Sequence, residues 1–424
     1  MCAPVGTSPG SKQGSHVFEE MNSSFDYDVI IAGGGPAGAS AAIHLSMSGA
    51  RVLLAEQKRF PRAKLCGEFI SPECTVHFER LGVVEQMLAA GPTSLTETVF
   101  YSRGGNRVGV PSAWFGAQGV ALGLSRAEMD ERLLRRAANC GVEVLEDAHV
   151  NSVLIEDDRV CGAKVRTSDR ELSFRAPITI DATGRTRALA RRLERAGNGS
   201  GPQRAPLVAF KAHLLNTRVE PGACEIYFYR GGYGGLSSIE GGLSNLCFIA
   251  AARDVRACDS DADRVMREVV CQNRRASQTL GSARVHSPWL AVSLEGFGRH
   301  SVAPARGLIA IGDAASFIDP FTGSGMLMAL ESGELAASVI AAHLDGIRHA
   351  TKLSELETQY RSAYQRRFDS RLRLCSIIRR AAFVPGLAEL AIRFFGLSKL
   401  LRRNLTRATR SGRRQDLRPF AASK

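Results

Sequence analysis

Three glycines and one acid near the start of the chain have the spacing of a site for an adenine dinucleotide. Gly33, Gly35 and Gly38 follow an apolar run, and Glu56 ends a second such run 18 residues after Gly38. Glycines in this pattern allow a tight turn, let the backbone approach a pyrophosphate, and let a helix pack closely on a strand. The helix that follows, with Ala37 in its first turn, directs free N–H groups at the diphosphate. The Glu56 carboxylate accepts hydrogen bonds from ribose hydroxyls.

The residues next to Glu56 leave two kinds of dinucleotide open. Gln57, Lys58 and Arg59 suit the 2′-phosphate of NADP, whereas the Glu56 carboxylate repels that group. The choice between FAD and NADP therefore depends on the rest of the chain.

A strand-to-helix loop far along the chain favours FAD. The apolar run 308–311 ends in Gly312-Asp313, and the loop beyond it carries Pro320, Gly323 and Gly325. An acid at the C-terminal end of a parallel strand can hold a ribityl hydroxyl. The helix N-terminus beyond Gly325 can support negative charge on a flavin ring. Neither role is useful to NAD alone, so we predict that FAD is the cofactor.

The order of the predicted elements indicates an α/β fold. Apolar runs at 27–31, 51–55 and 178–181 are typical of buried parallel strands, with helices between them. From 207 to 290 short strands of alternating polarity predict an antiparallel sheet. We expect a Rossmann-like FAD-binding domain with an inserted antiparallel-sheet substrate domain and C-terminal helices. The expected ranges are a disordered N-terminal extension at 1–25, the FAD-binding domain at 26–204 and 296–345, the substrate domain at 205–295, and a basic helical region at 346–424.

On these motifs the chain resembles a group of FAD-dependent oxidoreductases. The group includes geranylgeranyl reductases, flavin-dependent halogenases and aromatic monooxygenases of the p-hydroxybenzoate hydroxylase type, and the resemblance spans most of residues 26–345. It implies the glutathione reductase/p-hydroxybenzoate hydroxylase type of fold. It also implies that Arg126 lies near the flavin diphosphate or ribityl chain, and that Asp313 binds the ribityl chain. The matching pieces are the turn at 33–38, the loop 60–72, Leu124-Ser125-Arg126 with Asp130, Asp181-Ala182-Thr183-Gly184, and 312–325.

Local details of the resemblance bear on the reaction. The loop residues Lys64 to Glu68 are most similar to the geranylgeranyl reductase branch. The Trp-x-Trp-x-Ile-Pro segment of the halogenases has no counterpart around Trp114 or Trp289, which disfavours halogenation. The aromatic-Trp-Phe-Pro segment of the reductases is replaced here by residues 232–240, which lack the Trp and the Phe-Pro.

Two residues are the candidates for catalysis. Cys66 lies in the loop expected to border the flavin, beside Lys64, where a thiol can donate a proton; a buried, inert cysteine is the alternative. Tyr233 lies in a glycine-rich stretch that we expect to be a turn facing a flat ligand. The nearby aromatic residues either line an apolar pocket over the flavin or pack the core of the sheet, namely Tyr227, Phe228 and Tyr229. Glu68 and His213 are weaker acid–base candidates.

Composition excludes several other classes of protein. The ten cysteines are scattered, without ligand spacing, so no metal site is expected. No run of 18 apolar residues and no signal-peptide pattern occurs, which predicts a cytoplasmic protein. Nucleic-acid binding is not expected, because no recognised module accompanies the basic charge.

The charge of the chain is concentrated at its C-terminal end. Residues 361–424 carry 17 Lys and Arg against three Asp and Glu, a net charge of +14. Apolar residues between 386 and 405 recur at helical spacing, namely Leu387, Leu390, Phe394, Leu397 and Leu401. This amphipathic segment either lies on an anionic membrane surface or covers the substrate domain while its arginines stay in water.

These observations predict an FAD-dependent oxidoreductase that acts on a hydrophobic substrate, polyprenyl or aromatic and polyketide-like. A reductase of the geranylgeranyl reductase type is the first hypothesis, with NAD(P)H as a transient electron donor or an external donor in its place. An NAD(P)H- and O₂-dependent monooxygenase is the second. A non-catalytic FAD-binding or electron-relay protein is the third. The oligomeric state is left open.

Overall fold

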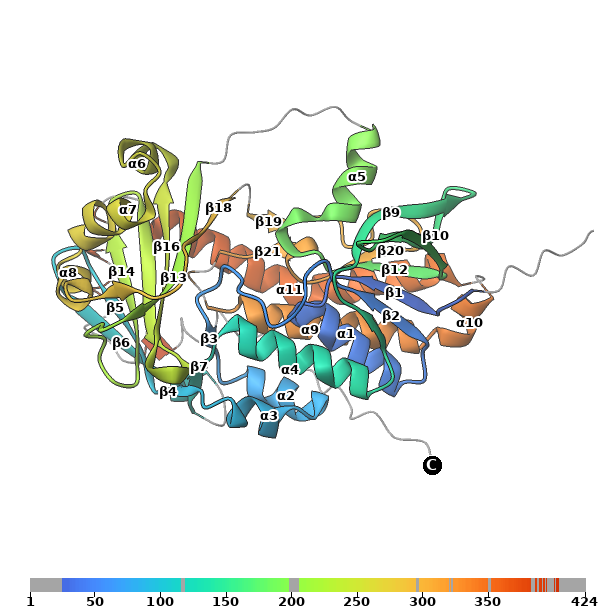
Figure 1. Ribbon diagram of the computed structural model, residues 1–424, viewed down its shortest axis with the longest axis horizontal. Helices are drawn as coiled ribbons and strands as arrows, with labels where there is room; N and C mark the ends of the chain where they lie inside the picture. The colour runs from blue at the N-terminus through green and yellow to red at the C-terminus, as the bar shows by residue number, and fades with distance from the viewer. Residues whose placement is uncertain are drawn as a thin grey trace, which may run out of the picture.

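The computed structural model has two lobes (Figure 1). Residues of both lobes line a cavity between them. One lobe is built on a parallel sheet with long helices, and the other on a large sheet capped by short helices. The structure describes residues 25–115, 119–197, 206–294, 297–319, 321, 323–349 and 352–382, and isolated positions between 386 and 403. The predicted extension at 1–25 therefore lies almost entirely outside the described residues.

The parallel sheet has five strands in the order β20-β12-β1-β2-β8. All four pairings are parallel, so the carboxyl ends of the strands share one edge. At that edge a ligand binds in open α/β sheets. The strands are β1 (Val29–Ala32), β2 (Val52–Ala55), β8 (Glu143–Leu145), β12 (Ile178–Asp181) and β20 (Leu308–Ala310).

Both faces of this sheet are covered, which explains the unbroken apolar runs in its strands. Val29 and Ile31 pack against helices, whereas Ile30 and Ala32 face a three-stranded sheet on the other side. The helices are α1 (Pro36–Met47), α2 (Cys74–Leu81), α3 (Val84–Ala89), α4 (Arg126–Asn139) and α9 (Gly325–Ala341). The three strands are β9 (His149–Glu156), β10 (Arg159–Arg166) and β11 (Glu171–Arg175), followed by α5 (Ala188–Gly197) after β12.

The second lobe is a sheet of eight strands, with β18 paired beside β13. Its pairings are antiparallel except between β5 and β14, where Glu97 is aligned with Ala223. Strands β5 and β6 belong to the range 26–204, which the sequence predicts to be part of the FAD-binding domain. The sheet therefore extends beyond the range 205–295 that is predicted for the substrate domain. Its strands are β5 (Glu97–Tyr101), β6 (Arg107–Pro111), β13 (Leu207–Leu215), β14 (Ala223–Tyr229), β15 (Gly232–Ser238), β16 (Ser244–Ala251), β17 (Arg284–Val285) and β18 (Leu290–Leu294).

The two faces of this sheet have different neighbours. One face packs on short helices, and the other lines the cavity. The helices are α6 (Ala252–Ala257), α7 (Ala262–Glu268) and α8 (Arg274–Leu280). Between the lobes lie the small strands β3 (Phe69–Ile70), β4 (Thr93–Leu95), β7 (Ala121–Gly123), β19 (Gly298–Arg299) and β21 (Ser316–Phe317).

The expectation that Tyr233 lies in a turn is wrong. The turn is at Arg230 and Gly231, and Tyr233 is the second residue of strand β15. The glycines of this stretch serve close packing inside the sheet. A Cβ at Gly232 would lie 1.9 Å from the carbonyl oxygen of Ile249 on the neighbouring strand.

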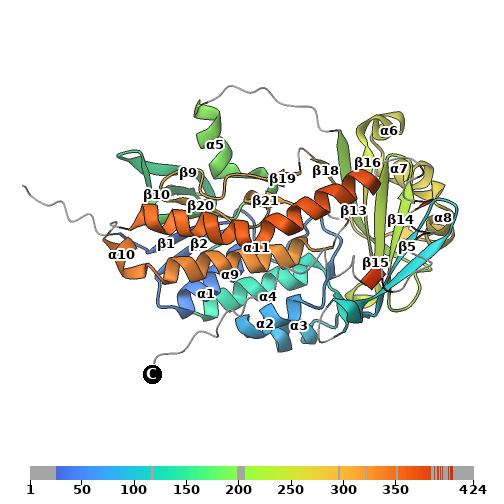
Figure 2. The same cartoon turned by 180° about the vertical axis from the view of Figure 1, so that it is seen from behind.

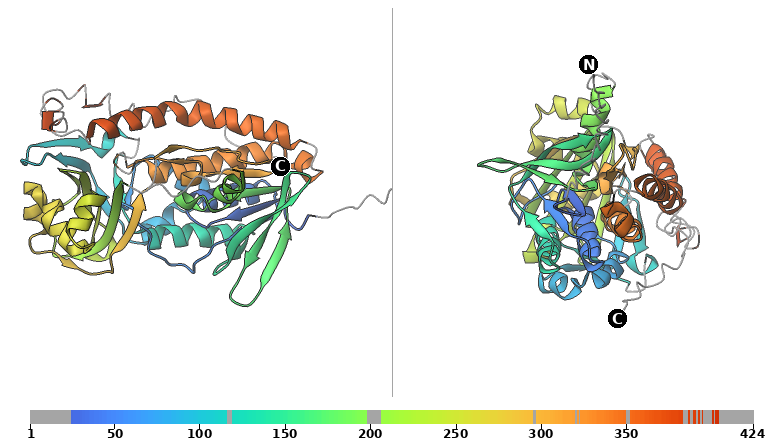
Figure 3. Two further views of the ribbon diagram at one scale, coloured as in Figure 1. Left: turned by 90° about the horizontal axis from the view of Figure 1, so that it is seen from above. Right: turned by 90° about the vertical axis from the view of Figure 1, so that its right-hand side faces the viewer.

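A long helix joins the two lobes on the back of the molecule (Figures 2 and 3). After α10 (Leu344–Arg348), helix α11 (Leu353–Ala382) packs Tyr360, Tyr364 and Phe368 against the core of the first lobe. Its last turns reach the cavity, which Leu374 and Ile378 line. The expected helical character of 346–424 thus holds for α11 among the described residues.

Candidate cofactor and substrate site

One cavity of about 1000 Å³ lies between the carboxyl edge of the parallel sheet and the inner face of the eight-stranded sheet. Residues from both predicted motifs line it, although they are nearly 300 positions apart in the chain. The lining includes Gly33, Gly35, Ala37, Glu56, Cys66, Arg126, Tyr233, Asp313, Gly323 and Gly325. Of the remaining predicted residues, Gly38 lies behind the turn, and Pro320 lies outside the described residues.

The glycine-rich turn has a separate steric reason at each position. Gly33 has φ of 109°, and a Cβ there would lie 2.5 Å from the backbone oxygen of Ala182. A Cβ at Gly38 would lie 1.9 Å from the oxygen of Gly33, so helix and turn touch. A Cβ at Gly35 would meet only the Arg126 guanidinium, at 3.8 Å. Gly35 therefore leaves open space at the N-terminus of α1, where a diphosphate can approach the backbone.

Glu56 stands at the end of β2 and is already part of the turn. Its carboxylate accepts the Gly34 N–H at 2.8 Å and the Lys58 N–H at 3.1 Å, and Arg62 lies 3.4 Å away. Lys58 and Arg59 are absent from the described lining of the cavity, and the exposed Arg59 pairs with Asp147. The basic residues that would suit NADP thus lie away from the cavity, which favours FAD.

Arg126 is fixed at the N-terminus of α4. Its guanidinium makes two 2.7 Å hydrogen bonds to the buried Asp130 carboxylate. Burial lowers the pKa of Arg126, but the charge and hydrogen bonds of Asp130 raise this pKa by a larger amount. The guanidinium therefore stays cationic. Desolvation by the surrounding protein lowers the pKa of Lys64. The positive charges of Arg62, Arg126 and Arg185 lower it as well. These four cations line one cavity, an arrangement suited to a diphosphate.

Asp313 lies in the short turn that follows β20, within electrostatic reach of three of these cations. Burial raises its pKa, whereas the charges of Arg185, Arg126 and Lys64 lower it. Gly323 and Gly325, at the start of α9, line the same part of the cavity. Helix α9 packs closely on α1, since a Cβ at Gly333 would lie 2.4 Å from the Ala37 oxygen. The two motifs therefore form one continuous wall.

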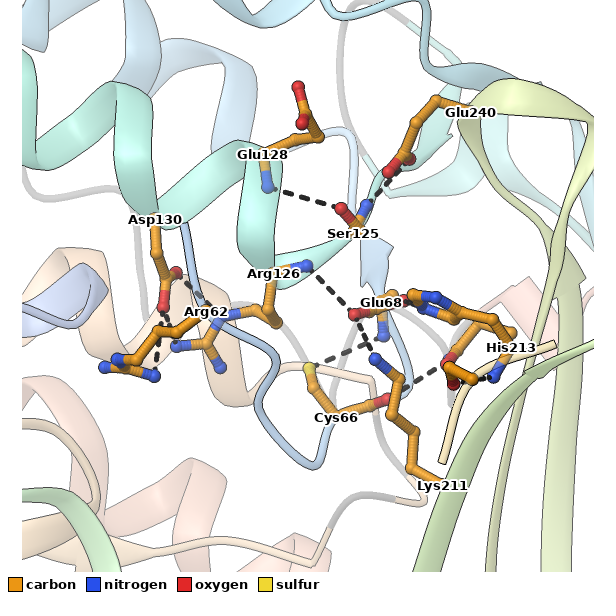
Figure 4. A network of polar contacts seen from close by, with 12 residues as sticks. Arg62, Cys66, Glu68, Ser125, Arg126, Glu128, Asp130, Lys211, His213 and Glu240 are labelled. Carbon is orange, nitrogen blue, oxygen red and sulfur yellow. Dashed lines mark hydrogen bonds and ion pairs between the residues drawn. The ribbon is translucent and has the colours of Figure 1, made fainter. Parts of the chain in front are cut away.

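A buried ion cluster connects the loop 60–72 to the second lobe (Figure 4). Glu68 is fully buried; its Oε1 accepts from Lys211 Nζ at 2.7 Å and from the Arg126 backbone N–H at 2.9 Å. Its Oε2 lies 2.7 Å from His213 Nε2. Burial raises the pKa of Glu68, but His213 and Lys211 lower it below the usual range. Glu68 and His213 are thus brought together, in a cluster that holds the loop against β13.

The same loop presents the Cys66 thiol to the cavity. The thiol accepts the Glu68 N–H at 3.4 Å and contributes to the raised pKa of Arg126. The Cys66 carbonyl accepts from Asn245 Nδ2 at 3.1 Å, which fixes the loop to β16. Cys247 on the same strand also lines the cavity, and burial raises the pKa of its thiol. Cys66 is therefore a half-buried thiol beside a cation, whereas Cys247 is an inert one.

The Tyr233 ring forms part of an aromatic wall. Its hydroxyl donates to the Asp319 carboxylate at 2.5 Å, and its ring stands edge-on to Phe321 with centroids 5.4 Å apart. Phe228 joins this cluster and lines the cavity. Tyr227 and Tyr229 point to the other face of the sheet and pack toward α6–α8. Of the two interpretations of these aromatics, the pocket role fits Phe228 and Tyr233, and the core role fits the other two.

Several residues of the site were not singled out by the sequence. Arg62 lies in the loop 60–72, and Arg185 directly follows Gly184 of another matching motif. Their positions next to these motifs are the sequence signal that could have identified them as site residues. Asp319 and Lys211 gave no local signal, because their partners are 86 and 143 positions away.

The residues that line the cavity fit FAD. They combine a glycine turn open to a diphosphate, four cations and the acid Glu56 with Asp313 and a helix N-terminus. A parallel sheet with this cavity at its carboxyl edge is the architecture of a dinucleotide-binding flavoprotein.

Comparison with known proteins agrees with this architecture. The model of the FAD binding domain family matches residues 26–369, and the chain belongs to that family. Digeranylgeranylglycerophospholipid reductase 2 of Methanopyrus kandleri is 26% identical over 76% of this chain and 78% of its own length. Menaquinone reductase of Mycolicibacterium smegmatis is 24% identical over 86% and 88%. A triple mutant of the flavin-dependent brominase Bmp2 has the same fold, with a TM-score of 0.74, 21% identity, and coverage of 92% and 96%.

The chain is therefore an FAD-dependent oxidoreductase, as its motifs predicted. Among the helices formed by described residues, none has both the length and the apolar character needed to cross a membrane.

Proposed function

We propose that the protein is a reductase of a hydrophobic substrate, with the substrate held in the part of the cavity nearest Tyr233. The observation that carries this proposal is the apolar wall beyond Asp313. It is formed by residues of both lobes and of α11, namely Phe100, Phe228, Tyr233, Phe317, Phe321 and Ile378. A pocket with apolar walls and few polar groups binds apolar ligands. Two relatives named as reductases of a polyprenyl lipid and of menaquinone support the same substrate class.

The residues that hold FAD in this proposal divide into two groups. Glu56 binds the adenosine ribose, while the N-terminus of α1 and Arg126 bind the diphosphate. Asp313 and the start of α9 bind the ribityl chain and the flavin ring. Bound FAD supplies the transfer of a hydride or of electrons, which no side chain of the protein can supply.

Cys66 completes the reduction of a carbon–carbon double bond. One carbon of the double bond takes up the hydride that the reduced cofactor would supply, and the other carbon takes the proton of the Cys66 thiol as the S–H bond breaks. Arg126 lies beside the sulfur and stabilises the thiolate, which regains a proton from water. Tyr233 orients the substrate from the opposite wall. Its hydroxyl proton is engaged by Asp319, and its pKa is raised by burial and by the Asp319 charge, so its role is one of shape.

NAD(P)H is the electron donor in this proposal, and it binds only transiently. The reason is that FAD takes up the glycine-rich turn and the cations around it. A second, exchangeable nucleotide must then approach from the open side of the cavity.

Anaerobic rapid-mixing measurements test the proposal. The FAD-loaded protein is mixed with NADPH or NADH, and the flavin absorption is followed. The reduced protein is then mixed with menaquinone or with a geranylgeranyl-bearing phospholipid. We expect reduction by one nicotinamide nucleotide and rapid reoxidation by a lipid, with the saturated product detected by mass spectrometry. Reduced flavin that no apolar acceptor reoxidises contradicts the proposal and favours an electron relay. Oxygen uptake coupled to a hydroxylated product assigns the protein to the monooxygenases instead.

A further inference from the structure

We propose that the end of α11, together with the exposed residues Leu390, Phe394, Leu400 and Arg403, docks on the surface of an anionic lipid bilayer, with the apolar end of the cavity directed at the lipid. The proposal rests on the proposed function, because an apolar substrate gives the protein a reason to dock. The observations that support docking are the exposure and the charge of surface residues. We call Ile377, Leu390, Phe394, Leu400 and Arg403 the docking face.

The docking face is unusually apolar for an exposed surface. Ile377 is 65% exposed, Leu390 63%, Phe394 58% and Leu400 70%. Among the described residues, these four are nearly half of the ten large apolar side chains that are exposed. Isolated exposed apolar residues are ordinary, but four of them between positions 377 and 400 favour an interaction surface.

The stretch that carries these residues is anchored on the second lobe. Asn106 Nδ2 donates to Glu389 Oε1 at 2.6 Å, and Arg402 Nη1 donates to the Gly109 carbonyl at 2.9 Å. Ile392 is buried in the aromatic cluster around Tyr233. Leu390 and Phe394, two positions to either side of Ile392, stay exposed. Of the five apolar residues that recur at helical spacing, Leu390 and Phe394 are thus exposed, whereas Leu387, Leu397 and Leu401 lie outside the described residues.

Exposed basic residues accompany the apolar ones, which favours an anionic bilayer over a neutral apolar partner. Arg403 is exposed, and Arg366 and Arg373 lie on the same exposed side of α11 as Ile377. Arg366 and Arg373 are seven positions apart, and Ile377 follows Arg373 by four. Such spacings place side chains on one face of a helix. Apolar side chains flanked by Arg and Lys are the composition of segments that lie in the headgroup region of anionic membranes. The net charge of +14 over 361–424 acts in the same direction.

The docking face is continuous with the cavity. Ile377 is exposed and also lines the cavity, so the cavity reaches the surface at the end of α11. Leu374, Ile378 and Ile392 continue the apolar lining inward to Tyr233. A lipid chain that leaves a bilayer at Ile377 therefore meets apolar side chains along its path into the site.

Vesicle binding tests the proposal without any turnover. The full FAD-loaded chain is sedimented with vesicles of phosphatidylcholine alone, or of phosphatidylcholine with phosphatidylglycerol. The test variant is Leu390→Glu with Phe394→Glu, and the matched control is Leu88→Glu with Ile155→Glu, whose side chains are 56% and 54% exposed on the first lobe. We expect binding only to the anionic vesicles, weakened about tenfold in the test variant and less than twofold in the control. Arg403→Glu should weaken binding less, and added salt should weaken it further.

Several outcomes would overturn the proposal. They are no binding of wild type to anionic vesicles, equal losses in the test and control variants, or a dimer that the test variant alone dissociates, which would assign the face to a second copy of the chain. Reduction of the flavin by NADPH in solution should be unchanged in both variants. A failure of that reaction in wild type contradicts the proposed function and leaves the vesicle result to decide on docking.

Discussion

A substitution at Gly35 tests the cofactor site, because its effect on FAD binding can be distinguished from any effect on folding. Its backbone has φ of −70° and ψ of −178°, which alanine adopts without strain, and an added Cβ meets nothing closer than Arg126 at 3.8 Å. Gly35→Ala should therefore fold normally and place its methyl group in the space predicted for the diphosphate. The effect on apo stability should stay within about 1 kcal/mol, the usual size of a compatible Gly-to-Ala change.

The expected loss of FAD affinity follows from the hydrogen bonds at the start of α1. Displacing the diphosphate costs at least one charge-assisted N–H bond, or about 1.5–3 kcal/mol, and so weakens binding roughly 10- to 150-fold. Gly38→Ala should act differently, because its Cβ would lie 1.9 Å from the Gly33 oxygen and would disturb the fold itself.

Quenching of flavin fluorescence on titration gives the dissociation constant, and thermal melts of the apo protein give stability. Gly104→Ala is the matched control, since a Cβ there also has its nearest neighbour at 3.8 Å and Gly104 is not among the residues that line the cavity. The reasoning is refuted if Gly35→Ala binds FAD as tightly as Gly104→Ala, or if it loses affinity only because it has unfolded.

Three further predictions concern the reaction, the pocket wall and pH. Cys66→Ser should slow substrate reduction by reduced protein about 100-fold or more while the FAD dissociation constant stays within about twofold, and equal single-turnover rates would rule out proton donation by the thiol. Tyr233→Phe should cost about 1–3 kcal/mol in urea unfolding, because the buried Asp319 loses one of its hydrogen-bond donors, yet should leave KM for the apolar substrate nearly unchanged; a large rise in KM would mean that the hydroxyl contacts substrate. Burial raises the pKa of Glu334, but His77 at 2.9 Å and Arg80 at 2.7 Å lower this pKa by a larger amount, so that its value is about 2. Its ion pairs therefore stabilise the fold above the ordinary Glu pKa and lose that effect as the pH falls toward 2. The stability gap between wild type and Glu334→Gln, at most about 3 kcal/mol near neutral pH, should close over that range.

Local motifs of the sequence predicted the first lobe well. Helix α1 (Pro36–Met47) follows the glycine turn with Ala37 in its first turn, as predicted, because the proline, the glycine turn and the alanine run are local signals. Helix α4 begins at Arg126, with Ser125 accepting the Glu128 N–H, and its buried residues Met129, Leu133, Leu134 and Ala137 recur at helical spacing. The positions of Gly33, Glu56 and Asp313 at one edge followed from the rule that parallel strands share their carboxyl ends.

Features that depend on distant partners were not predictable in the same way. The parallel alignment of Glu97 with Ala223 joins strands over 120 positions apart, and neither strand carries a sign of it. Tyr233 was placed in a turn because glycines are the usual turn signal, whereas here they make room for Ile249 on the next strand. The pairing of Lys211 with Glu68 requires both lobes to be in place.

Binding of FAD and its fragments to the apo protein tests the central claim most directly, because that claim joins two distant segments in one cofactor site. The account predicts that the colourless apo protein takes up one FAD, that Glu56→Ala weakens both FAD and ADP, and that Asp313→Ala weakens FAD and riboflavin while ADP binds as before. An apo protein that takes up no FAD, or variants that weaken all of these ligands alike, would contradict it.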